Sequence, residues 1–402
     1  MTRLPASLVP SLLHPLFLLL GSCGTPPPLA PPDLASPGAE DMCLSACGAE
    51  CVDTTTDPRH CGACNRACAP GQTCRMGTCQ GGGPPPDLAP PPDLGMPIPP
   101  ARGCWADPPP GAILAPPPPR YSGGTCPKLV AGKNAIKSMG HDRSFLLAVP
   151  RDLKPEEKLP LVFLWHWLGG SAQKFYEKGQ IQAAIDTQRF LAILPEAKSD
   201  MIFRWPFDIG VSQARMEEEF RFFDDMLSCA AAQFNVNRNC VSSVGVSAGA
   251  LFTAQLAAYR DRYLASAISL SGGVGSFAKP FGNPMRKIPF IVLWGGPTDA
   301  CLGIISFHNA SQELENALVR GGHFFLECIH NCGHAEPPFE GPPGLSKYAG
   351  LWQFVFDHPY WLRAGESPYR TGPLPAGLPP WCGIGKGSAR PRTGPCPDKP
   401  GC

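Results

Sequence analysis

A pentapeptide in the middle of the chain has the spacing of an activated serine nucleophile. It consists of Gly245-Val246-Ser247-Ala248-Gly249, which follows a short β-branched run and precedes an Ala- and Leu-rich helical pattern. A serine at a sharp turn between strand and helix is exposed at the helix N-terminus, where backbone N–H groups can stabilise an oxyanion. The two glycines leave room for the strand and the helix to pass closely. The alternative is a purely structural Gly/Ser turn, and the pentapeptide alone does not decide between the two.

Two further polar residues follow in the order that such a serine requires. Asp299 comes after an apolar run at 288–294, and His334 comes after a later apolar run. Serine hydrolases with this turn place the acid after the serine and the histidine last. We therefore predict that His334 takes the proton of Ser247 and that Asp299 fixes the tautomer of the imidazole. His330 is a rival base, four residues before His334.

An early loop is expected to complete the oxyanion hole. One donor would be the N–H of Ala248, directly after the nucleophile. The second would come from the loop after the apolar run at 159–166, where Gly169 and the glycine after it let the backbone approach a substrate closely. The N–H groups of Trp167 and Leu168 are the candidates in that loop.

Three aromatic residues are candidates for substrate contacts. Phe203, Trp205 and Phe207 lie between an apolar run at 190–195 and a long helical pattern, where folds of this kind carry substrate loops. Aromatic rings there could stack on a phenolic acid or a sugar, or receive a hydroxyalkanoate chain. They could equally belong to the core. His166 is expected to be a buried anchor of the oxyanion loop and not a second base.

The elements that must position these residues alternate between strands and helices. Continuous apolar runs are typical of strands that are buried on both faces. We expect strands at 144–150, 159–166, 190–195, 240–246, 265–271, 288–294 and 324–327, and helices at 213–234, 251–259, 311–320 and 350–363. This alternation predicts an α/β domain with a doubly wound, mostly parallel sheet.

From about residue 104 to residue 363, the chain resembles the secreted esterases grouped with polyhydroxybutyrate depolymerases and feruloyl esterases. The matching pieces are Pro160–Phe163, His166-x-x-Gly169-Gly170, the turn at 245–249, Asp299 and Gly333-His334. The resemblance implies an α/β-hydrolase fold and a serine esterase that needs neither a metal nor an organic cofactor. One departure is Trp167, which stands where the family usually has glycine. It leaves open whether the N–H of Trp167 or that of Leu168 completes the oxyanion hole.

Composition limits the class of protein. The chain of 402 residues has a formal net charge of +1, so it shows no basic surface of the kind that binds nucleic acid. Its 19 cysteines indicate an oxidising compartment. Its 51 prolines are concentrated near the N-terminus and in the C-terminal tail, where they predict extended spacers and a wrap over the domain.

The N-terminus predicts export. An apolar stretch at 8–20 follows Arg3 and is too short to span a bilayer, as in a secretory signal. It ends in Leu20-Gly21-Ser22-Cys23, which resembles the lipobox of bacterial lipoproteins and makes Cys23 the expected lipidation site. The alternative is an ordinary signal peptide that is cleaved nearby. We therefore expect an exported protein, held at the bacterial cell envelope by a lipid anchor only, or otherwise extracellular.

A second, smaller module precedes the catalytic part. Eight cysteines lie within residues 43–79 with few large apolar residues between them, so disulfides must replace a hydrophobic core. Cys61-x-x-Cys64 is expected to be part of this framework and not a zinc or redox site. The predicted organisation is a signal at 1–23, a Pro-rich linker at 24–42, the Cys-rich module at 43–79, a second linker at 80–103 and the α/β-hydrolase domain with its tail at 104–402.

One disulfide is predicted beside the triad. Cys301 lies two residues after the predicted acid, and Cys332 lies two residues before the predicted base. Because these two loops should meet above the sheet, we predict a Cys301–Cys332 bridge. Cys328 is a rival partner for either residue, and Cys229 and Cys240 could pair with each other. At least one disulfide should also hold the C-terminal tail.

The leading prediction is an exported serine esterase acting on feruloyl or acetyl esters of plant cell walls or on polyhydroxyalkanoate-type polyesters. A serine peptidase of the same fold is the second possibility, disfavoured because no propeller or large cap domain precedes the catalytic part. The third is a surface-binding lipoprotein with a vestigial hydrolase domain, which the intact Ser, Asp and His disfavour. The sequence leaves the oligomeric state open.

Overall fold

The computed structural model describes residues 45–47, 50–69, 72–80, 102–303 and 305–397. They belong to two compact units, Met1–Met96 and Pro97–Cys402. The predicted signal, Cys23 and the first Pro-rich linker lie outside the described residues, as does most of the second linker. No helix in the described ranges is long and apolar enough to cross a membrane.

Disulfides hold the short strands of the smaller unit. β1 (Ser45–Cys47) pairs with β2 (Glu50–Val52), and β3 (Thr73–Arg75) pairs with β4 (Thr78–Gln80), both antiparallel. The bridges described here are Cys47–Cys64, Cys61–Cys74 and Cys68–Cys79. Both cysteines of the Cys-x-x-Cys motif are therefore in disulfides, and neither offers the free thiolate that a zinc site would require.

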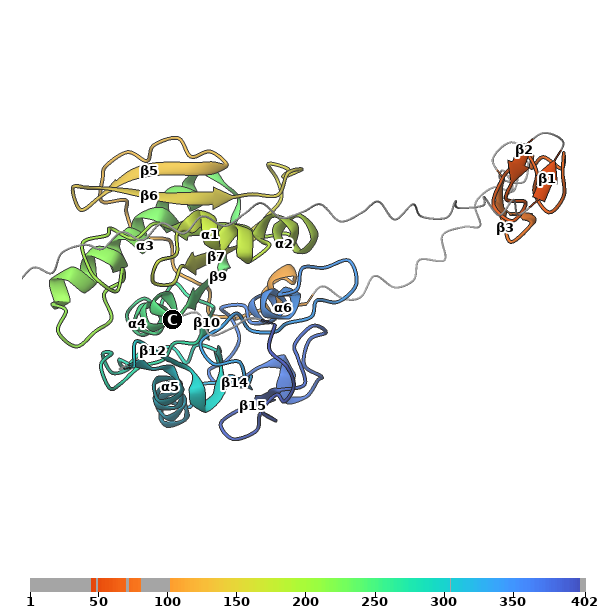
Figure 1. Cartoon of the computed structure of the whole chain (residues 1–402). Coiled ribbons are helices and arrows are strands. Elements are labelled where there is room, and N and C mark those ends of the chain that lie inside the picture. Colours follow the sequence, from red (N-terminus) through yellow and green to blue (C-terminus); the bar gives the residue numbers. More distant parts are fainter. Residues whose placement is uncertain (1–44, 48–49, 70–71, 81–101, 304, 398–402) are drawn as a thin grey trace, which may run out of the picture. The chain divides into compact units, whose positions relative to one another are not determined.

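A sheet of nine strands, all within the described residues, forms the centre of the larger unit. In spatial order the strands are β15 (Cys382–Ile384), β14 (Phe325–Ile329), β11 (Phe290–Trp294), β10 (Ser266–Leu270), β9 (Val236–Val246), β7 (Leu159–Trp165), β8 (Leu191–Pro195), β6 (His141–Ala148) and β5 (Gly132–Ser138). The strands from β14 to β8 are parallel; at the two edges β15 pairs antiparallel with β14, β6 with β8, and β5 with β6. Figure 1 shows β5 and β6 at the top of this unit and β14 and β15 at the bottom. The predicted mostly parallel α/β sheet is confirmed.

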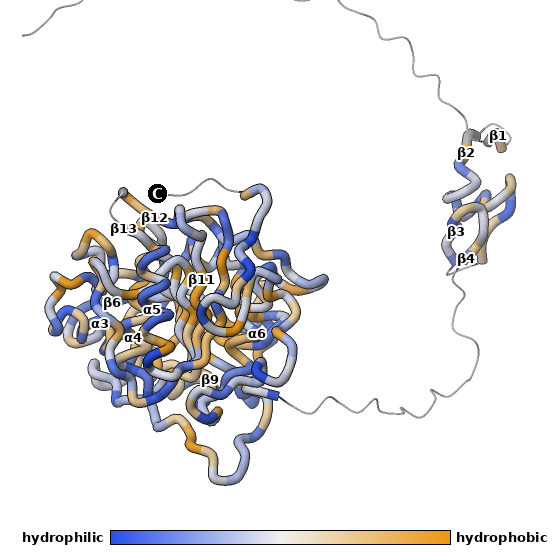
Figure 2. Tube along the Cα trace, turned by 90° about the horizontal axis from the view of Figure 1, so that it is seen from below, coloured by the Kyte–Doolittle hydropathy of each residue, from blue (hydrophilic) through white to orange (hydrophobic). Residues whose placement is uncertain are grey.

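Both faces of the sheet are apolar and covered by helices. In β7, Phe163 and Trp165 belong to the core on one face, and Val162 and Leu164 to the core on the other. The first face packs against α3 (Gln213–Gln233), α4 (Ala248–Tyr259) and α5 (Phe307–Gly321), and the second packs against α1 (Ala172–Lys178), α2 (Ile181–Gln188) and α6 (Ala349–Asp357). Figure 2 shows the hydrophobic interior around β11 between these two layers.

Several element boundaries differ from those expected. The last helix ends at Asp357 and not at residue 363, because Pro359 disfavours helical backbone in the residue before it. α5 begins at Phe307, ahead of the predicted start, because the hydroxyl of Ser306 accepts the N–H of Asn309 at 3.2 Å and caps the helix. α1, α2, β5 and β15 were not expected from the sequence. The same is true of the short elements η1 (Gly103–Trp105), η2 (Gly296–Thr298), β12 (Ala300–Cys301), β13 (Ile305–Ser306) and η3 (Pro368–Arg370).

The predicted Cys301–Cys332 disulfide is wrong. Cys332 pairs with Cys396 of the C-terminal tail. The alternative pairings are wrong as well. Cys328 pairs with Cys382, and Cys229 and Cys240 pair with other cysteines, in the bridges Cys126–Cys229 and Cys104–Cys240. The physical reason is that the tail runs along β14 as β15 and brings distant cysteines to the histidine loop. The expected stapling of the tail is confirmed.

Candidate active site

Ser247 lies at a strained turn between β9 and α4. Its φ angle is +55°, a backbone conformation that a residue with a side chain rarely adopts. The N–H of Ser247 donates to the carbonyl of Leu270 at 2.8 Å, and its carbonyl accepts the N–H groups of Ala250 at 2.9 Å and Leu251 at 3.0 Å. The neighbouring strand and the first turn of α4 therefore hold the serine in this conformation.

The glycines on either side of the serine are required by close packing. A Cβ atom on Gly245 would lie 2.1 Å from the carbonyl oxygen of Gly249. A Cβ atom on Gly249 would lie 2.0 Å from the carbonyl oxygen of Trp165, at the end of β7. Any larger residue would push the helix away from the strands, so these glycines bring the loop after β7 against the start of α4.

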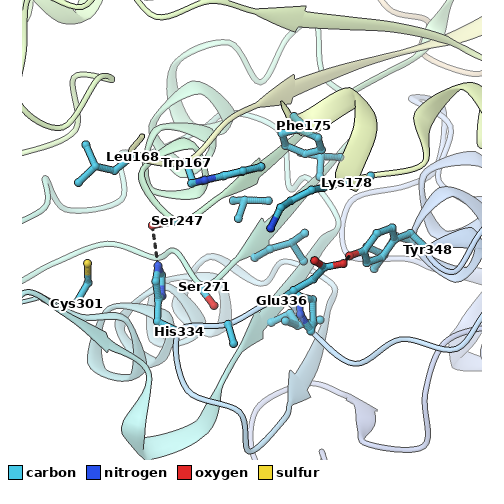
Figure 3. Close-up of a pocket in the computed structure, with 18 of the residues that line it drawn as sticks. Trp167, Leu168, Phe175, Lys178, Ser247, Ser271, Cys301, His334, Glu336 and Tyr348 are labelled. Carbon is cyan, nitrogen blue, oxygen red and sulfur yellow. Dashed lines mark hydrogen bonds between the residues drawn. The ribbon is translucent and has the colours of Figure 1, made fainter. Parts of the chain in front are cut away.

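The structure brings the three predicted triad residues together. The Nε2 atom of His334 lies 2.9 Å from the Oγ atom of Ser247 (Figure 3). Its Nδ1 atom lies 2.7 Å from Oδ1 of Asp299, a carboxylate that is fully buried. The second oxygen of Asp299 accepts the N–H of Gly295 at 2.7 Å and the hydroxyl of Ser271 at 2.8 Å. Nδ1 can therefore carry the imidazole proton, and Nε2 can accept the proton of Ser247.

The start of α5 supports both the acid and the base. The ring of Phe307 stacks on the imidazole of His334, with ring centres 4.2 Å apart and planes 14° apart. The N–H of Phe307 donates to the carbonyl of Asp299 at 2.9 Å. Sequence reasoning identified neither Phe307 nor Ser271. Ser271 ends the predicted strand at 265–271, and a polar residue at the carboxyl end of a parallel strand was the signal that could have found it.

His330, the rival base, is not placed to deprotonate the serine. It is fully buried, and its Nδ1 accepts the N–H of Cys332 at 3.2 Å. Burial lowers the pKa of His330 to about 4, with smaller effects from neighbouring charges. Within the described chain the imidazole that contacts Ser247 is that of His334.

Two of the three predicted oxyanion-hole residues line the cavity of the serine, and the third follows it in the chain. Trp167 and Leu168 line the same cavity as Ser247. In the part of the chain that is described, the N–H groups of Ala248, Trp167 and Leu168 donate to no other protein group. The second donor is therefore the N–H of Trp167 or that of Leu168, as the sequence predicted.

His166 is confirmed as a buried residue of the oxyanion loop. It is 1% exposed, and its Nδ1 lies 2.9 Å from the carbonyl oxygen of Trp167. Burial lowers the pKa of His166, which the carbonyl of Trp167 and the charge of Glu196 partly oppose. The indole N–H of Trp205 donates to the carbonyl of His166 at 2.8 Å, so core packing helps to fix the loop.

Three aromatic residues were predicted to contact the substrate, but all three pack in the core. Trp205 and Phe207 are fully buried, and the Trp205 ring meets the Trp165 ring edge-on with centres 5.1 Å apart. Phe203 is partly buried against the same core, 5.5 Å from the ring of Phe207. None of the three lines the cavity beside Ser247. The structure therefore corrects this prediction, and Trp205 acts on the site indirectly, through its hydrogen bond to the oxyanion loop.

The cavity beside Ser247 has a volume of about 490 Å³. It extends from Ser247 and His334 toward α1 and the segment before α6, as Figure 3 shows. Its apolar walls come from Trp167, Phe175, Val244, Val246, Leu270, Leu293, Leu351 and Trp352. Polar side chains are found at the end away from the serine, namely Lys178, Glu336 and Tyr348. An ester bound at Ser247 could thus place one of its two halves in a largely apolar pocket.

Comparisons with known proteins agree with the division into two units. Residues 40–81 match the Stigma-specific STIG1-like protein family. No curated protein matches the chain. Among solved structures, native pOPH is similar with a TM-score of 0.52 and 15% identity, over 65% of this chain and 97% of that chain. Native sOPH has a TM-score of 0.53 and 16% identity, over 67% and 99%. A ferulic acid esterase has a TM-score of 0.42 and 14% identity, over 50% and 90%. The larger unit thus has the α/β-hydrolase fold, and the disulfide-rich module that precedes it in the chain is similar to the STIG1-like family.

Proposed function

We propose that this protein is a serine esterase that hydrolyses carboxylic esters at Ser247. The observation that carries the proposal is the continuous hydrogen-bonded series from Ser247 through His334 to Asp299, at one end of an apolar cavity. A serine with a base and a buried acid in this arrangement is the general requirement for acyl transfer through a covalent intermediate.

In the first half of the reaction, the Oγ atom of Ser247 attacks the ester carbonyl as Nε2 of His334 takes its proton. Asp299 accepts the Nδ1 proton in a hydrogen bond and stabilises the imidazolium that forms. The N–H of Ala248 and a second N–H from the oxyanion loop stabilise the negative charge on the carbonyl oxygen. His334 then protonates the leaving alkoxide, and the acyl group remains on Ser247.

In the second half, a water molecule attacks the acyl carbonyl, and His334 takes the proton of that water. The tetrahedral intermediate collapses, the acid leaves, and His334 returns the proton to Ser247. Over the whole cycle, one water molecule is consumed, one alcohol and one acid are released, and Ser247 and His334 return to their starting protonation states.

We further propose that the substrates are feruloyl or acetyl esters of plant cell walls or polyhydroxyalkanoate-type polyesters, and that the protein is exported. The resemblance of its motifs to secreted esterases supports the first point. Disulfides in both units support an oxidising compartment. The lipobox-like sequence before Cys23 supports a lipid anchor, which mass spectrometry of the mature N-terminus would test.

The experiment that tests the activity is a substrate panel for the purified protein. It contains acetyl, butyryl and feruloyl esters, polyhydroxybutyrate and peptide amides. The proposal expects hydrolysis of at least one ester class and little or no cleavage of the amides. Preferential amide cleavage would favour a peptidase, and inactivity on every ester would favour the vestigial-domain alternative.

A further inference from the structure

The end of the cavity away from Ser247 presents one unused donor and one unused acceptor. Lys178, the last residue of α1, makes no hydrogen bond or ion pair with any residue that the structure describes, and its ammonium lies 5.8 Å from the centre of the Trp167 ring. Across the cavity, Oε1 of Glu336 accepts the hydroxyl of Tyr348 at 2.6 Å and also the ammonium of Lys347. The other oxygen of Glu336, Oε2, has no protein partner in the described ranges.

Glu336 is held as a carboxylate. Burial acts to raise its pKa, but the hydrogen bonds from Lys347 and Tyr348 and the positive charges of Lys347 and Lys178 outweigh this effect and lower it. Lys178 and Glu336 therefore face the same space with opposite charges. In Figure 3 both side chains point into the cavity, on the side away from His334.

The two charges restrict what can occupy that end of the cavity. Glu336 would repel an anionic group, and Lys178 would repel a cationic one. A plain alkyl or phenyl end would displace water from both side chains without replacing its hydrogen bonds, which is unfavourable. A neutral hydroxyl suits both side chains, because it can donate a hydrogen bond to the carboxylate and accept one from the ammonium.

We infer that the cavity takes an acyl group that carries a neutral hydroxyl at its far end, with the hydroxyl donating to Oε2 of Glu336 and accepting from Nζ of Lys178. This inference rests on the proposed esterase function. The acyl half is assigned to the cavity because it stays bonded to Ser247 after the alcohol has left. Trp167 and Phe175 could flank an aromatic ring, and the apolar walls would also suit an aliphatic chain, so the terminal hydroxyl is the shared chemistry.

Matched methyl esters test this inference. The aromatic pair is methyl 3-(4-hydroxyphenyl)propanoate and methyl 3-phenylpropanoate. The aliphatic pair is methyl 6-hydroxyhexanoate and methyl hexanoate, with monomethyl adipate as the anionic analogue. We expect kcat/KM to be about tenfold higher for the hydroxyl member of at least one pair, since Lys178 is exposed and Glu336 is half-buried, so that water can replace some of the loss. The pair that shows the preference distinguishes an aromatic from an aliphatic acyl group.

Two variants locate the preference. Lys178→Met and Glu336→Gln should each reduce the ratio within the preferred pair to less than about threefold. Both should still hydrolyse the member without a hydroxyl, because the triad is untouched. Lys133→Met, which replaces an exposed lysine of β5, should keep the wild-type ratio.

The possible outcomes distinguish a failure of the hydroxyl-binding inference from a failure of the proposed esterase function. Equal rates within both pairs would overturn the inference and leave the esterase intact, as would a preference that survives in both variants. A preference for monomethyl adipate would also overturn it, because it would show Lys178 binding a carboxylate. Failure to hydrolyse any of the five esters, together with inactivity on the wider ester panel, would count against the esterase itself.

Discussion

At the scale of single residues, the orientation of Asp299 depends on groups that are not part of the triad. One carboxylate oxygen faces His334, and the other is fixed by Gly295 and by Ser271. Ser271 adopts a φ of +49°, which is unfavourable for a residue other than glycine. The strained backbone places its hydroxyl where it can hold the acid, so we regard Ser271 as a positioning residue.

Ser271→Ala should lower kcat by about tenfold with little change in KM. The substitution removes a hydrogen bond to a buried carboxylate, which weakens the stabilisation of the imidazolium in the transition state more than it affects ester binding. The measurement is kcat and KM for one reactive ester, determined separately for the variant and the wild type.

Ser266→Ala is the matched control for this test. Ser266 is also buried on the same strand, but its hydroxyl lies 2.8 Å from that of Ser242, at the opposite end of β10. It should leave both kcat and KM unchanged. Equal kcat values for Ser271→Ala and the wild type, or an equal fall in kcat in Ser266→Ala, would show that the Ser271 contact has only a structural role.

At the scale of elements, much of the site could be predicted because its residues lie at the ends of apolar strands. β7 and β11 are continuous apolar runs and β10 is buried along its length, and polar residues at their carboxyl ends gather at one edge of a parallel sheet. The elbow pattern then identified Ser247, and chain order identified Asp299 and His334. The site was predictable where it depended on local pattern and strand order.

The parts that could not be predicted depend on packing between distant segments. The run at 203–207 has the composition of a substrate loop, and its burial is decided by contact with Trp165 and the core. Phe307 contacts His334 only because the loop after Asp299 returns to start α5. Cysteine spacing near the triad suggested Cys301–Cys332, whereas the tail supplies the actual partner of Cys332.

A buried carboxyl group links α5 to β14. Glu315 on α5 is fully buried, and neither of its carboxylate oxygens accepts a hydrogen bond from a donor group in the described structure. Burial, with a further contribution from the charge of Glu327 on β14, raises the pKa of Glu315 from its ordinary value of 4.5 to about 8. The folded protein therefore holds a proton that the unfolded chain loses above pH 4.5.

This proton should make the folded protein less stable as pH rises. Between about pH 4.5 and 8, Glu315 binds more protons in the folded than in the unfolded state. It then lowers the free energy of unfolding by up to about 1.4 kcal/mol per pH unit. Urea unfolding of the wild type and Glu315→Gln at several pH values measures this effect. The variant should lose less stability across this range, and parallel curves would contradict the raised pKa.

At the scale of the whole molecule, disulfides have different structural roles in the two units. In the smaller unit they connect short strands that have little apolar core of their own. In the larger unit they fix its edges, since Cys104–Cys240 holds the first segment and Cys332–Cys396 holds the tail beside the histidine loop. A closed loop restricts the unfolded chain, so each bridge stabilises the folded unit.

The double variant Cys332→Ser/Cys396→Ser should lower the free energy of unfolding of the larger unit by about 2–5 kcal/mol. It should also reduce kcat, because Cys332 lies two residues before His334. Urea unfolding followed by tryptophan fluorescence measures the first effect, since the described tryptophans lie in the larger unit. Cys68→Ser/Cys79→Ser, confined to the smaller unit, is the control and should leave the transition unchanged. Equal midpoints for both double variants would contradict a stabilising tail.

The most direct test of the central claim is the site of covalent modification by a fluorophosphonate ester, which reacts with an activated serine. Mass spectrometry of the digested protein should find one equivalent of the adduct on Ser247. Its formation should be slowed by several orders of magnitude in His334→Ala, which lacks the base that activates the hydroxyl. An adduct on another residue, or equally fast labelling of Ser247 in His334→Ala, would contradict the Ser247–His334–Asp299 mechanism.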